Sequence, residues 1–361
     1  MENGKILEGN GDIFLQEDLE NITDSNIPLE ELKDKTVFIT GATGLIGSLL
    51  VRTLLCCNRK KNTNVRILAL VRNRDKAEKI FKDLLKNESI EIVVGDVTGK
   101  LEINEKIDYI FHCASVTASK LMISKPVDVI RTSINGTENM LEVAREKSVK
   151  SMVYVSSMEM YGSFVEDPGK KVSEDMLGYI NPLMLRSNYP ESKRMCENMC
   201  VAYAAQYHVP VKIARLAQTF GAGILPGENR VFAQFARSAM SGSDIVLHTL
   251  GKSEGNYCYT RDVMRALLIL LVKGKDAEAY NIANEEAHIT IAAMANMVAT
   301  EIAETPVNVI FDIPDKNLYG YANDTKMHLD ASKMQALGWK PEVNLKEAYK
   351  RLIGSMQYQK L

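Results

Sequence analysis

The stretch that decides the fold spans residues 37–47 and reads Val37-Phe38-Ile39-Thr40-Gly41-Ala42-Thr43-Gly44-Leu45-Ile46-Gly47. An apolar, β-branched run stops at the first glycine, and two more glycines follow at three-residue intervals. Residues 48–55 then repeat apolar side chains at helical spacing. The stretch therefore predicts a strand, a tight turn and a helix.

Three glycines at this spacing, between a strand and a helix, predict a dinucleotide site. Gly41 allows the turn, Gly44 lets the backbone approach a pyrophosphate, and Gly47 lets the helix pack on the strand. The N-terminus of the helix directs free N–H groups and the positive end of its dipole at the phosphates. The cofactor-binding residues expected in this turn are Gly41, Thr43, Gly44, Leu45, Ile46 and Gly47.

The composition is ordinary for a globular chain of enzyme size. The 361 residues are 46% hydrophobic and 25% charged, and the formal net charge of -2 favours neither a nucleic-acid nor a membrane partner. The first five residues form no apolar leader core, and no apolar run is long enough for a bilayer. The six cysteines lack metal-ligand spacing, so we expect reduced thiols, no bound metal and a cytoplasmic location.

Strands and helices alternate after residue 35. Strands are predicted at 36–40, 66–71, 90–94, 108–112, 151–156 and 209–214, and helices near 45–57, 74–87, 126–147 and 190–207. Such alternation predicts parallel βαβ units, and hence an α/β fold with a Rossmann-type doubly wound parallel sheet that binds ligands at the carboxyl ends of its strands.

The C-terminal part mixes helices and short strands. Helices are predicted near 230–241, 261–273, 290–303 and 344–356, and strands near 245–248, 279–282 and 307–311. We therefore divide the chain into an N-terminal arm (1–34), an NAD(P)-binding domain (35–220) and a smaller, mainly substrate-binding lobe (221–361). Some segments of the lobe are expected to return to the cofactor domain.

Residues after the next three strands complete the expected cofactor site. Arg72 follows the second strand, where an acid usually holds the ribose 2′-OH of NAD and an arginine suits the 2′-phosphate of NADP. Asp96 follows the third strand, where a carboxylate would accept a hydrogen bond from the adenine amine, and Val97 is next to it. Small side chains that let a nicotinamide ribose lie close end the fourth strand: Cys113, Ala114 and Ser115.

Tyr189 and Lys193 are four residues apart and share a face of a predicted helix. A lysine ammonium beside a phenol stabilises the phenolate, so we expect a pKa of Tyr189 lowered toward neutrality. Such a phenolate takes a proton from a sugar hydroxyl while hydride leaves the same carbon. Ser157, at the end of the fifth strand, precedes the pair.

Together, these motifs resemble the extended short-chain dehydrogenase/reductase family of sugar-nucleotide enzymes. The glycine turn, Gly95-Asp96, Ser157 and Tyr189-x-x-x-Lys193 carry the resemblance, which covers roughly residues 35–350. It implies that Ser157 orients the substrate hydroxyl, that Tyr189 is the acid/base, and that Lys193 holds the ribose and tunes the tyrosine.

Finer motifs look most like the UDP-glucuronate decarboxylase branch. In that branch and in the 4,6-dehydratases, the glutamate that corresponds to Glu159 is a second acid/base acting on a 4-keto sugar. Decarboxylases then release carbon dioxide, whereas dehydratases lose water across C5 and C6. The segments that carry this likeness are His112-x-Ala114-Ser115, Gly136-Thr137-x-Asn139 and Asn181-Pro182-x-x-x-Arg186-Ser187-x-Tyr189.

Two positions depart from the pattern of the family. Dehydratases place an aspartate where this chain has Met158, which cannot protonate a leaving hydroxyl. The family usually carries an arginine seven residues before Asp262, on the diphosphate or the substrate, and this chain has Gly255 there. Arg230 or Arg261 is our hypothesis for a replacement. The expected substrate-binding residues are Thr117, Ser157, Met158, Glu159, Arg186, Gln218, Arg230 and Arg261.

We therefore expect an NAD(P)-dependent enzyme that oxidises a nucleotide sugar at C4, as a decarboxylase, a dehydratase or an epimerase. Return of the hydride to the sugar favours retained NAD, whereas Arg72 favours NADP. The alternatives are an NADPH-dependent ketoreductase of a keto-sugar or another carbonyl, and a non-catalytic nucleotide-sensing protein. Family members often dimerise through a four-helix contact, so we expect a homodimer built on helices 126–147 and 190–207.

Overall fold

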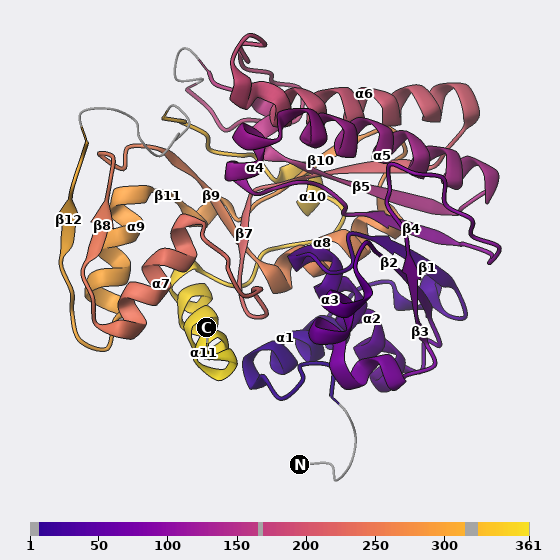
Figure 1. Cartoon of the computed structure of the whole chain (residues 1–361), viewed down its shortest axis with the longest axis horizontal. Helices are drawn as coiled ribbons and strands as arrows, with labels where there is room; N and C mark the ends of the chain where they lie inside the picture. The colour runs from indigo at the N-terminus through magenta and orange to yellow at the C-terminus, as the bar shows by residue number, and fades with distance from the viewer. Residues whose placement is uncertain (1–6, 165–168, 315–323, 361) are drawn as a thin grey trace.

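The central sheet has seven parallel strands, in the order β10-β6-β5-β4-β1-β2-β3 (Figure 1). The computed structural model describes residues 7–164, 169–314 and 324–360. The strands are β1 (Thr36–Thr40), β2 (Arg66–Val71), β3 (Ile90–Val94), β4 (Tyr109–His112), β5 (Ser151–Ser157), β6 (Val211–Leu216) and β10 (Ala279–Ile282). The strand order reverses beside β1, so a ligand crevice is expected between the ends of β1 and β4.

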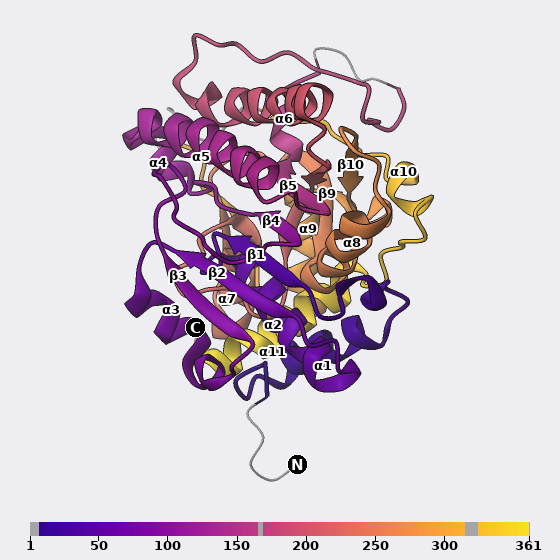
Figure 2. The same cartoon turned by 90° about the vertical axis from the view of Figure 1, so that its right-hand side faces the viewer.

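Helices cover both faces of this sheet (Figures 1 and 2). One face carries α4 (Ser119–Ser124), α5 (Pro126–Glu146) and α6 (Asn188–Tyr207). The other carries α2 (Leu45–Lys61), α3 (Arg74–Phe81) and α8 (Thr260–Lys273). Because both faces are covered, inner strands such as β6 are buried at every residue. The predicted doubly wound α/β fold is confirmed.

Within its described residues, the C-terminal part adds two small sheets and, besides α8, several further helices. A parallel pair joins β8 (Ile245–Leu247) to β12 (Val309–Phe311), and a second sheet has the order β11 (His288–Thr290), β9 (Glu254–Tyr259), β7 (Gln218–Phe220). The helices are α7 (Val231–Ser241), α9 (Ile291–Met297), which continues as a π-helical turn to Ile302, α10 (Ser332–Gln335) and α11 (Leu345–Gln359). The prediction anticipated neither β7, β9 and β11 nor the short helices α4 and α10.

An N-terminal helix, α1 (Ile13–Asp24), lies against α2, α8 and α11 (Figure 2). It begins at Asp12, whose carboxylate accepts a hydrogen bond from Leu15 N at 3.1 Å. Leu15, Leu19 and Ile22 point into the main hydrophobic core. The arm is thus part of the packed body, and its burial of apolar side chains supplies its stability.

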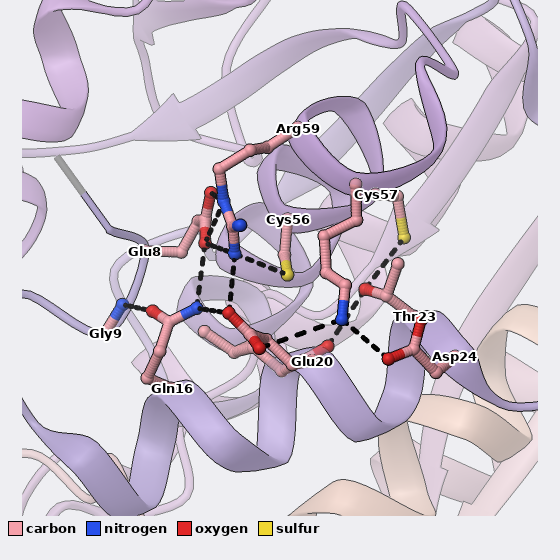
Figure 3. Close-up of polar contacts among 11 residues, drawn as sticks. Glu8, Gly9, Gln16, Glu20, Thr23, Asp24, Cys56, Cys57 and Arg59 are labelled. Atoms are coloured by element: carbon pink, nitrogen blue, oxygen red, sulfur yellow. Dashed lines mark hydrogen bonds and ion pairs between the residues drawn. The ribbon is translucent and has the colours of Figure 1, made fainter. Parts of the chain in front are cut away.

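Polar contacts also attach the arm to the second half of α2 (Figure 3). Arg59 donates to the Glu8 carboxylate at 2.9 to 3.2 Å and to Glu20 at 2.9 Å. The Thr23 hydroxyl lies 3.6 Å from the buried Cys57 thiol. Residues 8–24 therefore support the helix that starts at the glycine turn.

Among the helices of the described residues, none has the length and the apolar character that spanning a bilayer requires. Within the same ranges, no three His, Cys, Asp or Glu side chains are grouped as ligands for a metal ion.

Candidate active site

The glycine turn lies where β1 and β4 end. Gly41 follows β1 with a φ of +63°, and a Cβ there would lie 2.9 Å from the backbone of Ala114. Gly47 is packed more tightly, because its Cβ would lie 2.4 Å from the Gly41 carbonyl oxygen. Gly44 is the exposed N-cap of α2. The glycines therefore let two strand ends and a helix N-terminus meet at one point.

These residues fit a dinucleotide. The first turn of α2, Leu45 to Gly47, presents backbone N–H groups beside the half-buried Thr43. Ser115, just after β4, is half-buried, and its hydroxyl faces the phenol of Tyr189. A backbone cradle that Cβ atoms would fill, next to small side chains at the neighbouring strand end, is what such a ligand needs.

Arg72 and Asp96 lie near each other at the ends of β2 and β3. Burial works against the charge of Asp96, but hydrogen bonds from Thr98 N and Oγ1, at 2.9 and 2.8 Å, and the Arg72 guanidinium lower the pKa of the carboxyl overall. Both side chains are exposed, whereas Val97 is buried against Gly136. The structure thus brings the two adenosine-side candidates together.

His112 ends β4 and is buried between two threonine hydroxyls. Its Nδ1 lies 2.7 Å from Thr40 Oγ1, and its Nε2 lies 3.3 Å from Thr137 Oγ1. Burial, assisted by the positive charge of Lys193, lowers the pKa of His112 to about 3. Burial also raises the pKa of the adjacent Cys113 to about 12. Both side chains are therefore neutral.

We expect the neutral, buried His112 to reduce folding stability in acid. Between the ordinary pKa of 6.5 and the folded value of about 3, the unfolded chain binds a proton that the native chain does not. The free energy of unfolding therefore falls as pH drops through this window, by about 2 kcal/mol at about pH 5 from this group alone. Urea unfolding at about pH 7.5 and about pH 5 measures the loss. His112→Gln should remove the part of this loss that is due to His112. If the variant keeps the pH dependence of the wild type, the loss does not come from His112.

Tyr189 lies in the first turn of α6, where its ring packs against Met122 and Val129. The hydroxyls of Ser157, at the end of β5, and of Ser115, after β4, approach the phenol closely enough to lower its pKa. Lys193 is buried one turn further along. Its Nζ lies 5.7 Å from the centre of the Tyr189 ring and donates to Val155 O at 2.8 Å. The fold therefore brings Ser157, Tyr189 and Lys193 together.

The predicted low pKa of Tyr189 is wrong for the chain by itself. Burial is the largest influence, and with the negative charge of Glu159 it raises the pKa of Tyr189 above its usual value. The two serine hydroxyls and Arg186 oppose that shift only in part. Burial also lowers the pKa of Lys193. The sequence spacing places an ammonium near the phenol but contains no information on the burial that raises the pKa of Tyr189.

Glu159 and Arg186 form an ion pair at the edge of this group. Arg186 Nη2 donates to Glu159 Oε2 at 3.0 Å, and the guanidinium carbon lies 6.0 Å from the centre of the Tyr189 ring. Both side chains are partly exposed, at 37% for Glu159 and 22% for Arg186. A carboxylate and a guanidinium are thus both available to a ligand beside the phenol.

The two positions that depart from the family pattern touch each other. Met158 is buried, and its Cε would lie 3.3 Å from a Cβ at Gly255. Met327 belongs to the same apolar cluster. Since β9, which carries Gly255, was not predicted, its contact with the turn after β5 was not foreseen.

The other predicted substrate residues are less closely grouped. Gln218 begins β7 opposite Tyr257 and is half-buried, and Thr117 is exposed in the loop before α4. Arg230 pairs with Glu228 at 2.7 Å. Arg261 turns to the N-terminal helix, with Nη1 3.7 Å from Asp18, so the structure does not support it as the replacement arginine. The register of α8 directs its side chain toward α1.

A buried network behind the phenol was also missed. Glu197, four residues after Lys193 on α6, accepts hydrogen bonds from Ser156 and from Arg215 of β6. Arg215 in turn donates to the Tyr161 hydroxyl at 2.9 Å. The signal available in the sequence was the four-residue spacing from Lys193, which places Glu197 one helical turn further along.

Comparison with known proteins identifies the family. The model of the NAD dependent epimerase/dehydratase family matches residues 37–283. UDP-glucuronic acid decarboxylase 1 of Danio rerio is 28% identical over 327 residues, which are 90% of this chain and 73% of that protein. dTDP-D-glucose 4,6-dehydratase of Homo sapiens is 26% identical over 337 residues, covering 88% of this chain and 89% of that one.

A solved structure shows the same fold. UDP-glucose 4-epimerase of Thermotoga maritima, determined with UDP-glucose, superposes with a TM-score of 0.75 at 22% identity, over 90% of this chain and 100% of that one. The family match runs from β1, just before the glycine turn, to the end of β10, and so includes all seven strands of the central sheet. The chain therefore belongs to the NAD dependent epimerase/dehydratase family.

Proposed function

We propose that the protein is an NAD(P)-dependent enzyme that modifies a nucleotide sugar by oxidising its C4 to a 4-keto intermediate. The observation that carries the proposal is the position of Tyr189. Its phenol lies beside serine hydroxyls from the ends of two adjacent strands, close to the glycine turn, with Lys193 one helical turn away. A proton acceptor and a cofactor cradle at one crevice suit removal of a proton and a hydride from one carbon.

In the proposed oxidation, Tyr189 removes the proton of the C4 hydroxyl. Ser157 holds that hydroxyl, and the ammonium of Lys193 stabilises the phenolate form of Tyr189 that accepts the proton. A nicotinamide held at the glycine turn would supply a reversible hydride acceptor for the C4 carbon. Because the phenol has a raised pKa in the chain by itself, we expect turnover to increase with pH until Tyr189 is deprotonated.

Glu159 and Arg186 are proposed to act in the step that follows. Their ion pair is partly exposed and borders the phenol, so a sugar placed with its C4 at Tyr189 would meet both groups. Arg186 would bind an anionic substituent, and Glu159 would exchange a proton with the 4-keto sugar. Met158 supplies no proton, which favours decarboxylation or epimerisation over loss of water.

The cofactor that we propose is NAD. The family name, the fit of the glycine turn and a reaction that returns its hydride all favour it. Arg72 leaves NADP as the second choice, although Arg72 already lies near the carboxylate of Asp96. Parallel titrations of the purified chain with NAD and NADP would show which cofactor binds with the higher affinity.

Mass spectrometry of products decides the reaction. Purified protein is incubated with a panel of nucleotide sugars that includes UDP-glucuronate, first without added cofactor. Loss of carbon dioxide identifies a decarboxylase, loss of water a dehydratase, and a new isomer of unchanged mass an epimerase. A product that appears only when NADPH is supplied and that gains two hydrogens supports a ketoreductase, the alternative that the exposed Arg72 favours.

We also propose a homodimer that lies in the cytoplasm. Exposed apolar side chains gather on α4, α5, α6 and the loop before α6, which lie side by side in Figures 1 and 2. They are Leu121, Ile123, Val127, Ile130, Leu183, Met184, Leu185, Met195 and Val201. A large exposed apolar patch of this kind usually marks an interface. Six cysteines, all free thiols, favour the reducing cytoplasm.

Met195→Glu should convert the proposed dimer to a monomer. The side chain is 50% exposed on α6, so the change adds a charge to the patch without entering the core. Sedimentation velocity at micromolar concentration measures the state. Val246→Glu, at an exposed apolar site on β8, is the matched control and should leave the mass unchanged. A monomeric wild-type protein would refute the dimer.

A further inference from the structure

A buried ion pair joins α6 to β6 directly behind the candidate active site. Arg215 donates to both carboxylate oxygens of Glu197, from Nε at 3.1 and 3.1 Å and from Nη2 at 2.7 Å. Each side chain is only 8% exposed. Taking two charges out of water is costly, so a buried ion pair contributes little to the free energy of unfolding. The presence of this pair therefore needs another explanation.

Both members of the pair form hydrogen bonds with the segment that carries Ser157 and Glu159. Glu197 accepts a hydrogen bond from Ser156 Oγ at 2.6 Å, one residue before Ser157. Arg215 donates to the Tyr161 hydroxyl at 2.9 Å, two residues after Glu159. The Tyr161 hydroxyl then donates to Asn281 Oδ1 of β10 at 2.7 Å. The turn after β5 is therefore held on both sides of the proposed acid/base carboxylate.

The same pair bears on the helix that carries the phenol. Glu197 lies one helical turn after Lys193, and Lys193 lies one turn after Tyr189. The other titratable groups that face Lys193 are His112, Cys113, Tyr154, Tyr189, Cys196 and Cys200. Glu197 is the carboxylate of this set, and its charge raises the pKa of Lys193 against the effect of burial.

We propose that Glu197 and Arg215 are positioning residues that hold the Tyr189–Lys193 helix and the Ser157–Glu159 turn in one fixed arrangement. Neither residue is required to touch the substrate. The inference rests on the proposed function for its catalytic readout. It predicts that removing the charge of Glu197 affects the chemical step more than substrate binding.

Steady-state kinetics of Glu197→Gln over a range of pH test the proposal. The amide keeps the shape and still accepts the Ser156 hydrogen bond, but it leaves Arg215 without its anion. We expect kcat to fall by about 10- to 100-fold with KM changed by less than about threefold, as for an interaction needed in the transition state. The alkaline limb of kcat should move to lower pH, because Lys193 then loses its proton more easily.

Two further variants separate positioning from folding. Tyr161→Phe deletes a single hydroxyl of the network and should lower kcat less than Glu197→Gln while the protein remains folded. Lys212→Gln breaks another ion pair of β6, in which Lys212 lies 2.6 Å from Asp276, and should cost stability without moving the pH profile. A folded Glu197→Gln protein with wild-type kcat and pH profile would overturn the proposal.

Hydrogen exchange decides the case independently of turnover. In the absence of substrate, Glu197→Gln should accelerate amide exchange in residues 157–161 and 188–193, whereas Lys212→Gln should not. If the wild-type protein turns over none of the nucleotide sugars but the two variants show this exchange pattern, the proposed function fails and the positioning role stands. Equal exchange in the two variants would refute the positioning role whatever the wild-type activity.

Discussion

Tyr189→Phe is expected to lower kcat by about 10²- to 10⁴-fold, the range that a positioned general acid/base contributes. The substitution removes the phenol oxygen but keeps the ring that packs against Met122 and Val129. Cofactor affinity and folding stability should therefore remain close to those of the wild type. Turnover of the substrate found in the nucleotide-sugar panel gives kcat, and titration with NAD gives the affinity.

A tyrosine on the same helix provides the matched control. Tyr203 donates to Glu142 of α5 at 2.7 Å and lies nearly four helical turns after Tyr189, so Tyr203→Phe also deletes a phenol oxygen from α6. It should leave kcat unchanged. If Tyr189→Phe keeps more than about a tenth of the wild-type kcat, the phenol is not the acid/base, and the proposed oxidation at C4 loses its main support.

Local patterns were enough to predict the central sheet. The glycine turn and the alternation of apolar runs with helical repeats place β1 to β6 within two residues, because each run buries its own side chains. The helix ends were predicted less well, since α2 ends four residues after its predicted end and α3 ends six residues before it. The strand β9 was not predicted from local patterns. Its residues 255–259 are all buried, without alternation, and its partners β7 and β11 have three residues each. Strands this short are fixed by distant pairing, which a local pattern does not contain.

The candidate site could also be predicted only in part. The order of Ser157, Tyr189 and Lys193 could be read from motifs, and the structure places the three together. The pKa of Tyr189 could not be read, because it depends on burial by helices α4 and α5. Arg261 was a hypothesis for the replacement of the family arginine that is missing at Gly255, but its guanidinium lies beside Asp18 of the N-terminal arm. Such long-range partners are set by packing alone.

Gly47→Ala is expected to destroy the dinucleotide site. A Cβ at this position would lie 2.4 Å from Gly41 O and 2.8 Å from Ala42 Cα, and both obstacles are backbone atoms. The helix must therefore move away from β1, at a cost of about 1–3 kcal/mol in the free energy of unfolding. That movement also displaces the N–H groups of the first turn of α2, so we expect NAD affinity to fall by more than about tenfold.

Gly44→Ala separates the two effects. Gly44 is exposed, has a φ of −85° that alanine adopts readily, and would bring its Cβ no closer than 3.2 Å to Gly41 O. This variant should unfold at nearly the wild-type urea concentration but bind NAD more weakly, because the new methyl group stands where the pyrophosphate approaches. Loss of affinity in both variants with loss of stability only in Gly47→Ala would assign Gly44 to the ligand and Gly47 to the packing of α2 on β1. Wild-type affinity in Gly44→Ala would place the phosphates elsewhere.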